Sequence, residues 1–179
     1  LAYGFDKSSS RKVLVFDLGG GTFDVSLMSI SNGVFDVKAT SGDTQLGGND
    51  FDQRIVDWLA EDFLEKNKID LRRDRQSLQR LTEAAEKAKQ ELSGVQATPI
   101  SLPFISTGND GPLHIETSLT RKMYESLCND LLDNLFGPVN SVIDDSGWNP
   151  DEIDEVVLVG GSTRMPMVKQ LVKTLVPNP

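Results

Sequence analysis

The residues with the clearest chemical potential form a glycine turn between two carboxylates. Asp17 ends a short apolar run and Asp24 opens the next alternating segment, and between them lie three glycines, Gly19, Gly20 and Gly21. Glycine permits a tight chain reversal and the close approach of a ligand. Exposed N–H groups and the Thr22 hydroxyl suit phosphate oxygens, and carboxylates suit hydrated magnesium. An ordinary hairpin with solvated acids explains the turn alone equally well.

The flanking segments predict the strands that would position this turn. Residues 13–16 form a branched and aromatic run, which indicates a buried strand. The returning strand alternates, with Asp24, Ser26 and Met28 expected on its outer side. A third strand is predicted at 34–40, which completes an antiparallel meander. Residues 41–49 are expected to be a loop that leads into a helix.

Two long helices are predicted next. Asn49 or Asp50 is expected to cap the first, whose apolar stripe recurs every fourth residue: Phe51, Ile55, Leu59 and Phe63. The second is expected from Arg75 or Gln76 to about Leu92, with a seam of Leu78, Leu81, Ala85, Ala88 and Leu92. On another face of this helix the spacing i, i+3, i+7 brings together Glu86, Lys89 and Ser93. By pattern alone that face is solvated and carries a salt bridge.

A hairpin and further helices follow. Strands are predicted at 96–105 and 113–119, joined by a loop at 107–112, and the single histidine, His114, is expected to be structural or at the surface. Thr120 is expected to cap a helix with Met123, Leu127, Leu131 and Leu135 on one face, beside a buried Cys128. Pro138 is expected to begin another helix, which Gly147 ends.

The last motif joins a strand, two glycines and a helix. Residues 155–159 predict a buried parallel strand, Gly160 and Gly161 a tight turn, and Pro166 to about Leu175 a helix. Glycines at the carboxyl end of a parallel strand allow an anion or a sugar to approach. Many α/β crossovers use glycine there, so the motif alone is only moderately specific.

Composition narrows the class of protein. The formal net charge of −9 over 179 residues argues against nucleic acid or an anionic membrane as the main partner. The single cysteine excludes an internal disulfide and fits a reducing compartment. No apolar run approaches the length of a membrane span. Residues 1–12 are expected to be irregular. The chain opens at Leu1 without methionine and stops in loop-like sequence, so it is expected to be a piece of a longer protein.

Four motifs in order resemble one family. VFDLGGGTFDVSLM, SGDTQLGGNDFD, LTEAAEKAKQELS and VVLVGGSTRMP are similar to the heat-shock-protein-70 (DnaK-like) chaperones, in lobe II of their actin-like ATPase domain. The resemblance covers essentially the whole chain. It implies an α/β fold with a ribonuclease-H-like core at 1–46 and 129–179 and an inserted α+β subdomain at 47–128.

The resemblance also implies a site for ATP or ADP with Mg²⁺. Asp17 and Asp24 would hold the ion through its water shell and, with Thr22, form an incomplete catalytic set. The nucleotide contacts implied are Gly19, Gly20, Gly21 and Thr22 at the β- and γ-phosphates, Gly48 close to them, Glu86, Lys89, Gln90 and Ser93 facing the adenosine, and Gly160, Gly161, Ser162 and Arg164 packing against it. Gln90 stands where cytosolic members carry an arginine that stacks on adenine.

The same resemblance implies a parent protein that couples ATP hydrolysis to peptide binding in protein folding and the stress response. Its expected partners are lobe I, the peptide-binding domain, a GrpE-type nucleotide-exchange factor and a J-domain co-chaperone, in a bacterial cytoplasm or plastid stroma. The chain alone is expected to bind nucleotide weakly and hydrolyse almost none, because the residues of lobe I are missing from it. The alternative is a non-catalytic module that docks the exchange factor. A sugar or acetate kinase is disfavoured by GGNDFD and EKAKQELS.

Overall fold

The computed structural model describes residues 10–176, which divide into two compact units. One unit contains the described residues up to Gly48 together with those from Leu132 onward, and the other is Asn49–Leu131. The boundaries predicted from the sequence, at 46/47 and 128/129, lie two and three residues earlier. The prediction of irregular structure for residues 1–9 lies outside the described residues.

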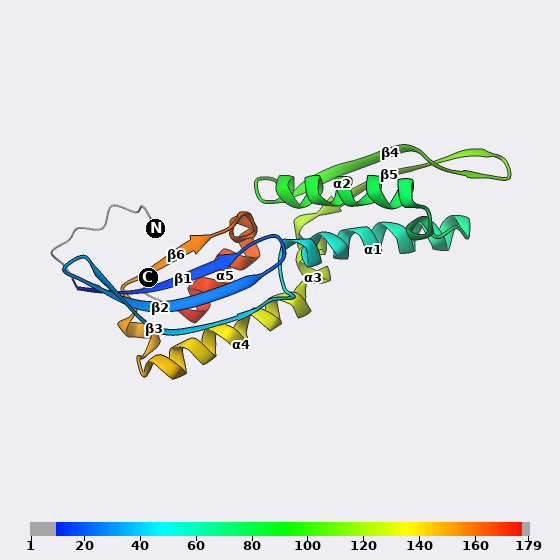
Figure 1. The fold of residues 1–179 in the computed structure, drawn as a ribbon. Coiled ribbons are helices and arrows are strands. Elements are labelled where there is room, and N and C mark those ends of the chain that lie inside the picture. Colours follow the sequence, from blue (N-terminus) through cyan, green and yellow to red (C-terminus); the bar gives the residue numbers. More distant parts are fainter. Residues whose placement is uncertain (1–9, 177–179) are drawn as a thin grey trace. The chain divides into compact units, whose positions relative to one another are not determined.

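The first unit is built on a four-stranded sheet in the order β3-β2-β1-β6 (Figure 1). Its strands are β1 (Arg11–Leu18), β2 (Phe23–Ser31), β3 (Val34–Asp43) and β6 (Glu155–Val159). The first three pair antiparallel, and β6 pairs parallel to β1. The predicted meander and the predicted parallel strand are therefore confirmed, although β1 begins two residues before the expected strand.

Alternation along β1 and β2 gives the sheet its most completely buried face. Leu14, Phe16 and Leu18 are at most 1% exposed, as are their cross-strand partners Leu27, Val25 and Phe23. The rings of Phe16 and Phe23 lie 4.7 Å apart at 51°. Full burial of such a side chain contributes about 1.5–3 kcal/mol. The helices α4 (Asn129–Ser146) and α5 (Pro166–Leu175) run alongside this sheet (Figure 1).

Two expectations about burial in this sheet are wrong. Met28 is only 7% exposed, although it lies on the expected outer side, because it packs with Val13 and Ile30 in a cluster on that side. The expected burial of β6 also fails, since Leu158 and Val159 are each 36% exposed. As the last strand of the described sheet, β6 has a neighbour on one side only.

The segment between β3 and α1 (Gly48–Asn67) is shorter than the predicted loop. Residues 41–43 belong to β3, because Gly42 pairs with Asp24 across the sheet. The helix begins at Gly48, so Asn49 and Asp50 lie in its first turn instead of capping it. An acidic residue in that turn still favours the helix, because it faces the positive end of the helix dipole.

The chain around Cys128 differs from the prediction in its helical phase. The Thr120 cap is confirmed, since its side chain accepts from the Met123 amide at the start of α3 (Arg121–Leu127). The helix breaks at Cys128, however, and Met123 is 40% exposed while Tyr124 is buried instead. Cys128 itself is fully buried, as expected.

Pro138 does not begin a new helix. It lies inside α4, which runs without interruption to Ser146. Proline removes one backbone hydrogen bond from a helix interior, so this helix forms despite a local cost. Gly147 ends it as predicted, with a positive φ of 70° that favours glycine.

The second unit combines α1 with α2 (Arg75–Leu92) and a two-stranded hairpin, β4 (Ala97–Gly108) and β5 (Gly111–Thr120). The predicted stripe of α1 is confirmed, and so is the seam of α2 except for the half-buried Leu78. The hairpin turn contains only residues 109 and 110, so the loop is shorter than the predicted loop at 107–112. His114 is structural, because its Nδ1 accepts from the Phe104 amide at 2.7 Å.

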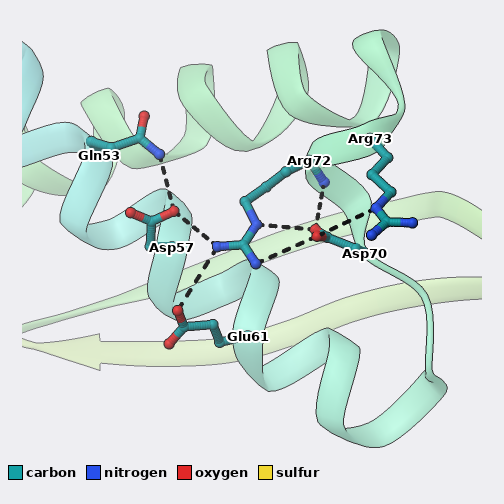
Figure 2. A network of polar contacts seen from close by, with 6 residues as sticks. All are labelled: Gln53, Asp57, Glu61, Asp70, Arg72 and Arg73. Carbon is teal, nitrogen blue, oxygen red and sulfur yellow. Dashed lines mark hydrogen bonds and ion pairs between the residues drawn. The ribbon is translucent and has the colours of Figure 1, made fainter.

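Arg72 links the connection between α1 and α2 to the surface of α1 (Figure 2). Its Nε lies 3.0 Å from Asp70 Oδ1, and its Nη1 lies 3.1 Å from Asp57 Oδ1 and 3.8 Å from Glu61 Oε1. Gln53 donates to the same oxygen of Asp57. The guanidinium holds the pKa of the Asp70 carboxyl below its usual range, chiefly through their side-chain hydrogen bond.

The variant Arg72→Met keeps an apolar stem but removes the charged fork, and we expect it to destabilise the protein near pH 7. Because the folded pKa of Asp70 is lowered, its contribution is present above its ordinary pKa of 3.8 and is lost as the pH falls through the folded value. The stability difference between wild type and variant should therefore be smaller in acid than near pH 7. Urea unfolding of both proteins, in acid and near pH 7, measures it.

The matched control is Lys66→Met. Lys66 forms an exposed pair with Asp62 one turn away on α1, and such pairs contribute little. An equal loss in both variants, or a loss from Arg72→Met that does not change with pH, would contradict the assignment of stability to this network.

Candidate functional site

The turn between β1 and β2 presents two carboxylates and exposed main-chain groups at one end of the sheet. Asp17 and Asp24 are direct cross-strand partners, Asp17 half-buried and Asp24 exposed. The Gly19 amide donates to the Thr22 carbonyl at 3.0 Å and closes the turn. The residues between them are solvent-exposed. The two acids and the turn predicted from the sequence therefore lie together.

The loop before α1 supports the turn by close main-chain contact. The Gly48 amide donates to the Gly19 carbonyl at 2.8 Å. A Cβ on Gly47 would lie 2.6 Å from the Gly20 carbonyl oxygen and from the Gly21 main chain. Gly48, expected near bound phosphate, therefore uses its amide to hold the turn. Gly47 has an equally strict packing role that the sequence analysis did not identify.

The loop after β6 packs against the same turn. Gly160 has a φ of +90°, and a Cβ there would lie 2.2 Å from the Leu18 carbonyl oxygen. Ser162 is buried and its hydroxyl donates to the Gly19 carbonyl at 3.1 Å. The hydroxyl of Ser162, expected at a nucleotide, is thus part of the support for the turn.

An open cleft of about 890 Å³ lies beside these residues. Its lining includes Asp17, Gly160, Gly161 and Arg164, all predicted from the sequence, and also Lys169 from α5. Arg164 is exposed, so it supplies a cation at the edge of this cleft. Lys169 was not predicted, because nothing in its sequence context separates it from an ordinary solvated lysine.

The remaining predicted residues lie on α2, in the other unit. Gln90 donates to Glu86 at 3.2 Å, and the Ser93 hydroxyl donates to the Lys89 carbonyl at 3.4 Å. Lys89 Nζ lies 2.8 Å from Asp52 Oδ2 on α1, with only 13% and 10% of the two side chains exposed. The face thus carries a salt bridge, but one that crosses to another helix and is largely buried.

Asp52 is the residue here that sequence reasoning missed. It is 7% exposed, and its Oδ1 has no hydrogen-bond partner among the described residues. Burial raises the pKa of its carboxyl, and the hydrogen bond and charge of Lys89 counteract that effect. The two residues stand 37 positions apart, so no local pattern could have connected them.

Two other kinds of site find little support in the described residues. Burial raises the pKa of the Cys128 thiol to about 12, so it stays protonated and is a poor nucleophile. Across residues 10–176 no cluster of three or more histidine, cysteine, aspartate or glutamate side chains could hold a metal directly.

No helix in that range has the length and apolar character to cross a membrane.

Comparison with known proteins decides the family. A model of the Hsp70 protein family matches residues 1–178. The chain belongs to the Hsp70 family. It is 76% identical over 177 residues to a chaperone protein dnaK1 of Prochlorococcus marinus, covering 99% of this chain and 27% of that protein. It is 66% identical over 176 residues to chaperone protein DnaK of Trichormus variabilis, covering 98% of this chain and 26% of that protein.

The chain therefore spans about a quarter of the length of these cyanobacterial DnaK relatives. Within the Hsp70 family it is a segment of the ATPase domain, and its α/β fold agrees with that assignment. The expected membership and fold class are confirmed. The expected roles of single residues in nucleotide and magnesium binding stay predictions.

Gly160→Ala tests whether the turn needs this glycine. The Cβ would meet the Leu18 carbonyl and require a left-handed backbone for a non-glycine residue, so we expect a loss of about 2–4 kcal/mol in the free energy of unfolding. Urea unfolding measures it.

Gly161→Ala is the adjacent control, because a Cβ there meets nothing within 4 Å. It should change the free energy of unfolding by no more than about 0.5 kcal/mol. Equal stabilities for the two variants would show that the close approach of Gly160 to Leu18 does not constrain the fold.

Proposed function

We propose that this chain supplies one wall of the ATP- and ADP-binding site of a DnaK-type chaperone. The observation that carries the proposal is the pair Asp17 and Asp24, set opposite each other across a turn that two glycine loops support. In the proposal the β- and γ-phosphates lie against the amides of Gly20, Gly21 and Thr22. Oriented main-chain amides form a favourable concavity for anions.

The conformation of Gly21 supports a close approach by phosphate. Its φ is not in the left-handed region, and a Cβ there would meet nothing within 4 Å. The fold itself therefore does not demand glycine at this exposed position. A ligand that lies directly against the main chain would explain why residue 21 is a glycine.

The carboxylates fit magnesium held through water. Mg²⁺ keeps several of its own waters and is commonly bound by one or two carboxylates together with substrate phosphates. Asp17 and Asp24 provide two such groups, one half-buried and one exposed. A bound Mg²⁺ would neutralise part of the phosphate charge. Asp17 and Asp24 would orient its waters, and Thr22 would add a hydroxyl beside them.

The nucleoside is assigned to two surfaces. One is the loop of Gly160 and Gly161 with the exposed Arg164, whose planar guanidinium can lie along a base. The other is the α2 surface of Glu86, Lys89, Gln90 and Ser93. Gln90 offers a planar amide, already bonded to Glu86, for the adenine edge.

The whole chaperone, in this proposal, hydrolyses ATP in its complete cleft and thereby switches peptide binding. Lobe I and the peptide-binding domain complete the machinery, and a J-domain co-chaperone and a GrpE-type exchange factor regulate it. The names of the relatives support chaperone activity, and their cyanobacterial sources support a bacterial cytoplasm over a plastid stroma. In this proposal the unit of residues 10–48 and 132–176 is the core, and the unit of residues 49–131 is the inserted subdomain.

Asp24→Asn should weaken magnesium-dependent ADP binding by about tenfold or more, because one charge-assisted contact to the ion's water shell is lost. Calorimetric titration with ADP, with and without Mg²⁺, measures this. Asp36→Asn, on exposed β3, is the control of equal charge change. Equal weakening in both variants, or unchanged affinity in Asp24→Asn, would contradict the proposed role.

Gly21→Ala should leave the free energy of unfolding nearly unchanged, because its Cβ meets open space. It should nevertheless weaken ADP binding roughly fivefold, since the methyl group would keep phosphate from the main chain. Urea unfolding and calorimetry measure the two effects separately. Unchanged affinity in a fully folded variant would remove the phosphate from this turn.

A second function, a non-catalytic module that docks an exchange factor, is favoured by one observation. Phe104 is 70% exposed on β4, with a positive φ of 54°, and Arg80 holds its carbonyl and that of Pro103. A rigidly presented apolar ring suits a protein contact. Titration with a GrpE-type factor and with ADP separates the functions, because the module alternative requires factor binding without nucleotide binding.

A further inference from the structure

The ion pair of Asp52 and Lys89 is the most buried pair recorded in residues 10–176. Its two side chains are 10% and 13% exposed, whereas in each other recorded pair at least one side chain is 30% exposed or more. Both residues belong to the unit Asn49–Leu131, so the contact joins α1 to α2 within one compact body. This contact holds the head group of Lys89, which belongs to α2, against Asp52 on α1.

Stability alone does not account for this pair. Burying two charges costs free energy that their attraction often fails to recover, particularly when hydrogen bonding is incomplete. Asp52 Oδ1 lacks a hydrogen-bond partner among the described residues, and burial raises the pKa of this carboxyl. An apolar pair would pack between α1 and α2 without that cost. The position therefore carries a charged pair for a reason other than helix packing.

The rest of the α2 surface is ordered in the same way. Glu86 accepts from Gln90, and Ser93 bonds to the main chain of Lys89. A lysine without a fixed partner samples many rotamers, and the loss of that rotamer entropy opposes its fixation. Asp52 orders the side chain before any ligand arrives. It also offsets the positive charge, so Lys89 acts as a directed N–H donor more than as a source of positive field.

We propose that Asp52 is the positioning residue of the α2 surface, holding the Lys89 ammonium so that it donates to the uncharged nucleoside part of a bound nucleotide. The inference rests on the proposed function and extends it by one residue on α1. An ammonium group carries three N–H donors, and one of them points at Asp52 Oδ2, 2.8 Å away. Asp52 touches no ligand itself and acts through Lys89.

A double-mutant cycle on ADP affinity tests the proposal. Lys89→Met and Asp52→Asn should each weaken binding by about threefold to tenfold, the range for one hydrogen bond. The double variant should bind no more weakly than Lys89→Met alone, because Asp52 has nothing left to position. Multiplying effects, or wild-type affinity in Asp52→Asn, would overturn the proposal. Asp62→Asn, which removes an exposed charge from the same helix, should bind like wild type.

A second measurement starts from the wild-type chain, so its first part remains available where Asp52→Asn fails to fold. On addition of ADP to the wild-type chain, the NMR signals of Lys89 Nζ and the Asp52 carboxyl carbon should both shift. ADP binding that leaves Lys89 unchanged would overturn the inference and leave the nucleotide site standing. If the chain binds no ADP, the proposed function fails. Lys89 ammonium protons that exchange as slowly in Asp52→Asn as in wild type would then overturn the positioning role independently.

Discussion

Close packing of main chain against main chain, at the end of the sheet where β1 turns into β2, is the constraint on which the candidate site depends. Gly160, Gly47 and Gly42 approach this turn so closely that a Cβ would lie 2.2, 2.6 and 2.4 Å from a main-chain oxygen. A side chain at any of them would push two segments apart. The carboxylates and amides of the turn would move with those segments, so the geometry of the site depends on contacts that contain no functional group.

Strand register brings these elements to one place. Asp17 pairs with Asp24 on β2 and with Val159 on β6, so both the turn and Gly160 emerge at the same end of β1. A slip of one residue would turn Asp17 toward the opposite face of the sheet. The buried side chains of Leu14 and Phe16 oppose that slip, because it would expose them to the other side. The apolar core thus specifies where the acids point.

Local patterns predicted much of this arrangement. The antiparallel meander, the parallel strand, the Thr120 cap and the limits of α2 followed from periodicity and from the chemistry of turns. Errors arose where tertiary contacts decide. Pro138 is typical of a helix start but lies within α4. Met123 has helical spacing to Leu127 but is exposed, and the helix that contains it ends at Leu127. Neither feature has a signal within a few neighbouring residues.

The candidate site divides along the same line. Its acids and glycines stand close together in sequence, so the turn could be identified before its geometry was known. The hydrogen-bond partners of the supporting residues could not be predicted from local sequence. Ser162 donates to the main chain of the turn, and Lys89 donates to an aspartate 37 positions away. Hydrogen bonds between segments that are distant in sequence form only in the complete fold. The spacing of residues within one helix therefore cannot predict them.

The net charge of −9 bears on the kind of donor that the proposed site would use for phosphate. With 27 acidic and 18 basic residues, the protein produces a field that repels an anionic ligand over distances beyond the first shell of contacts. Salt screens that repulsion at distances beyond about 10 Å. Amides, a directed ammonium and a hydrated cation act at contact distance. The acids of the turn would repel phosphate by themselves, so a cation between them and the phosphate is a physical requirement of the proposed site. In the proposed site the Lys89 charge, which Asp52 offsets, would add a donor for the nucleoside without attracting phosphate to that surface.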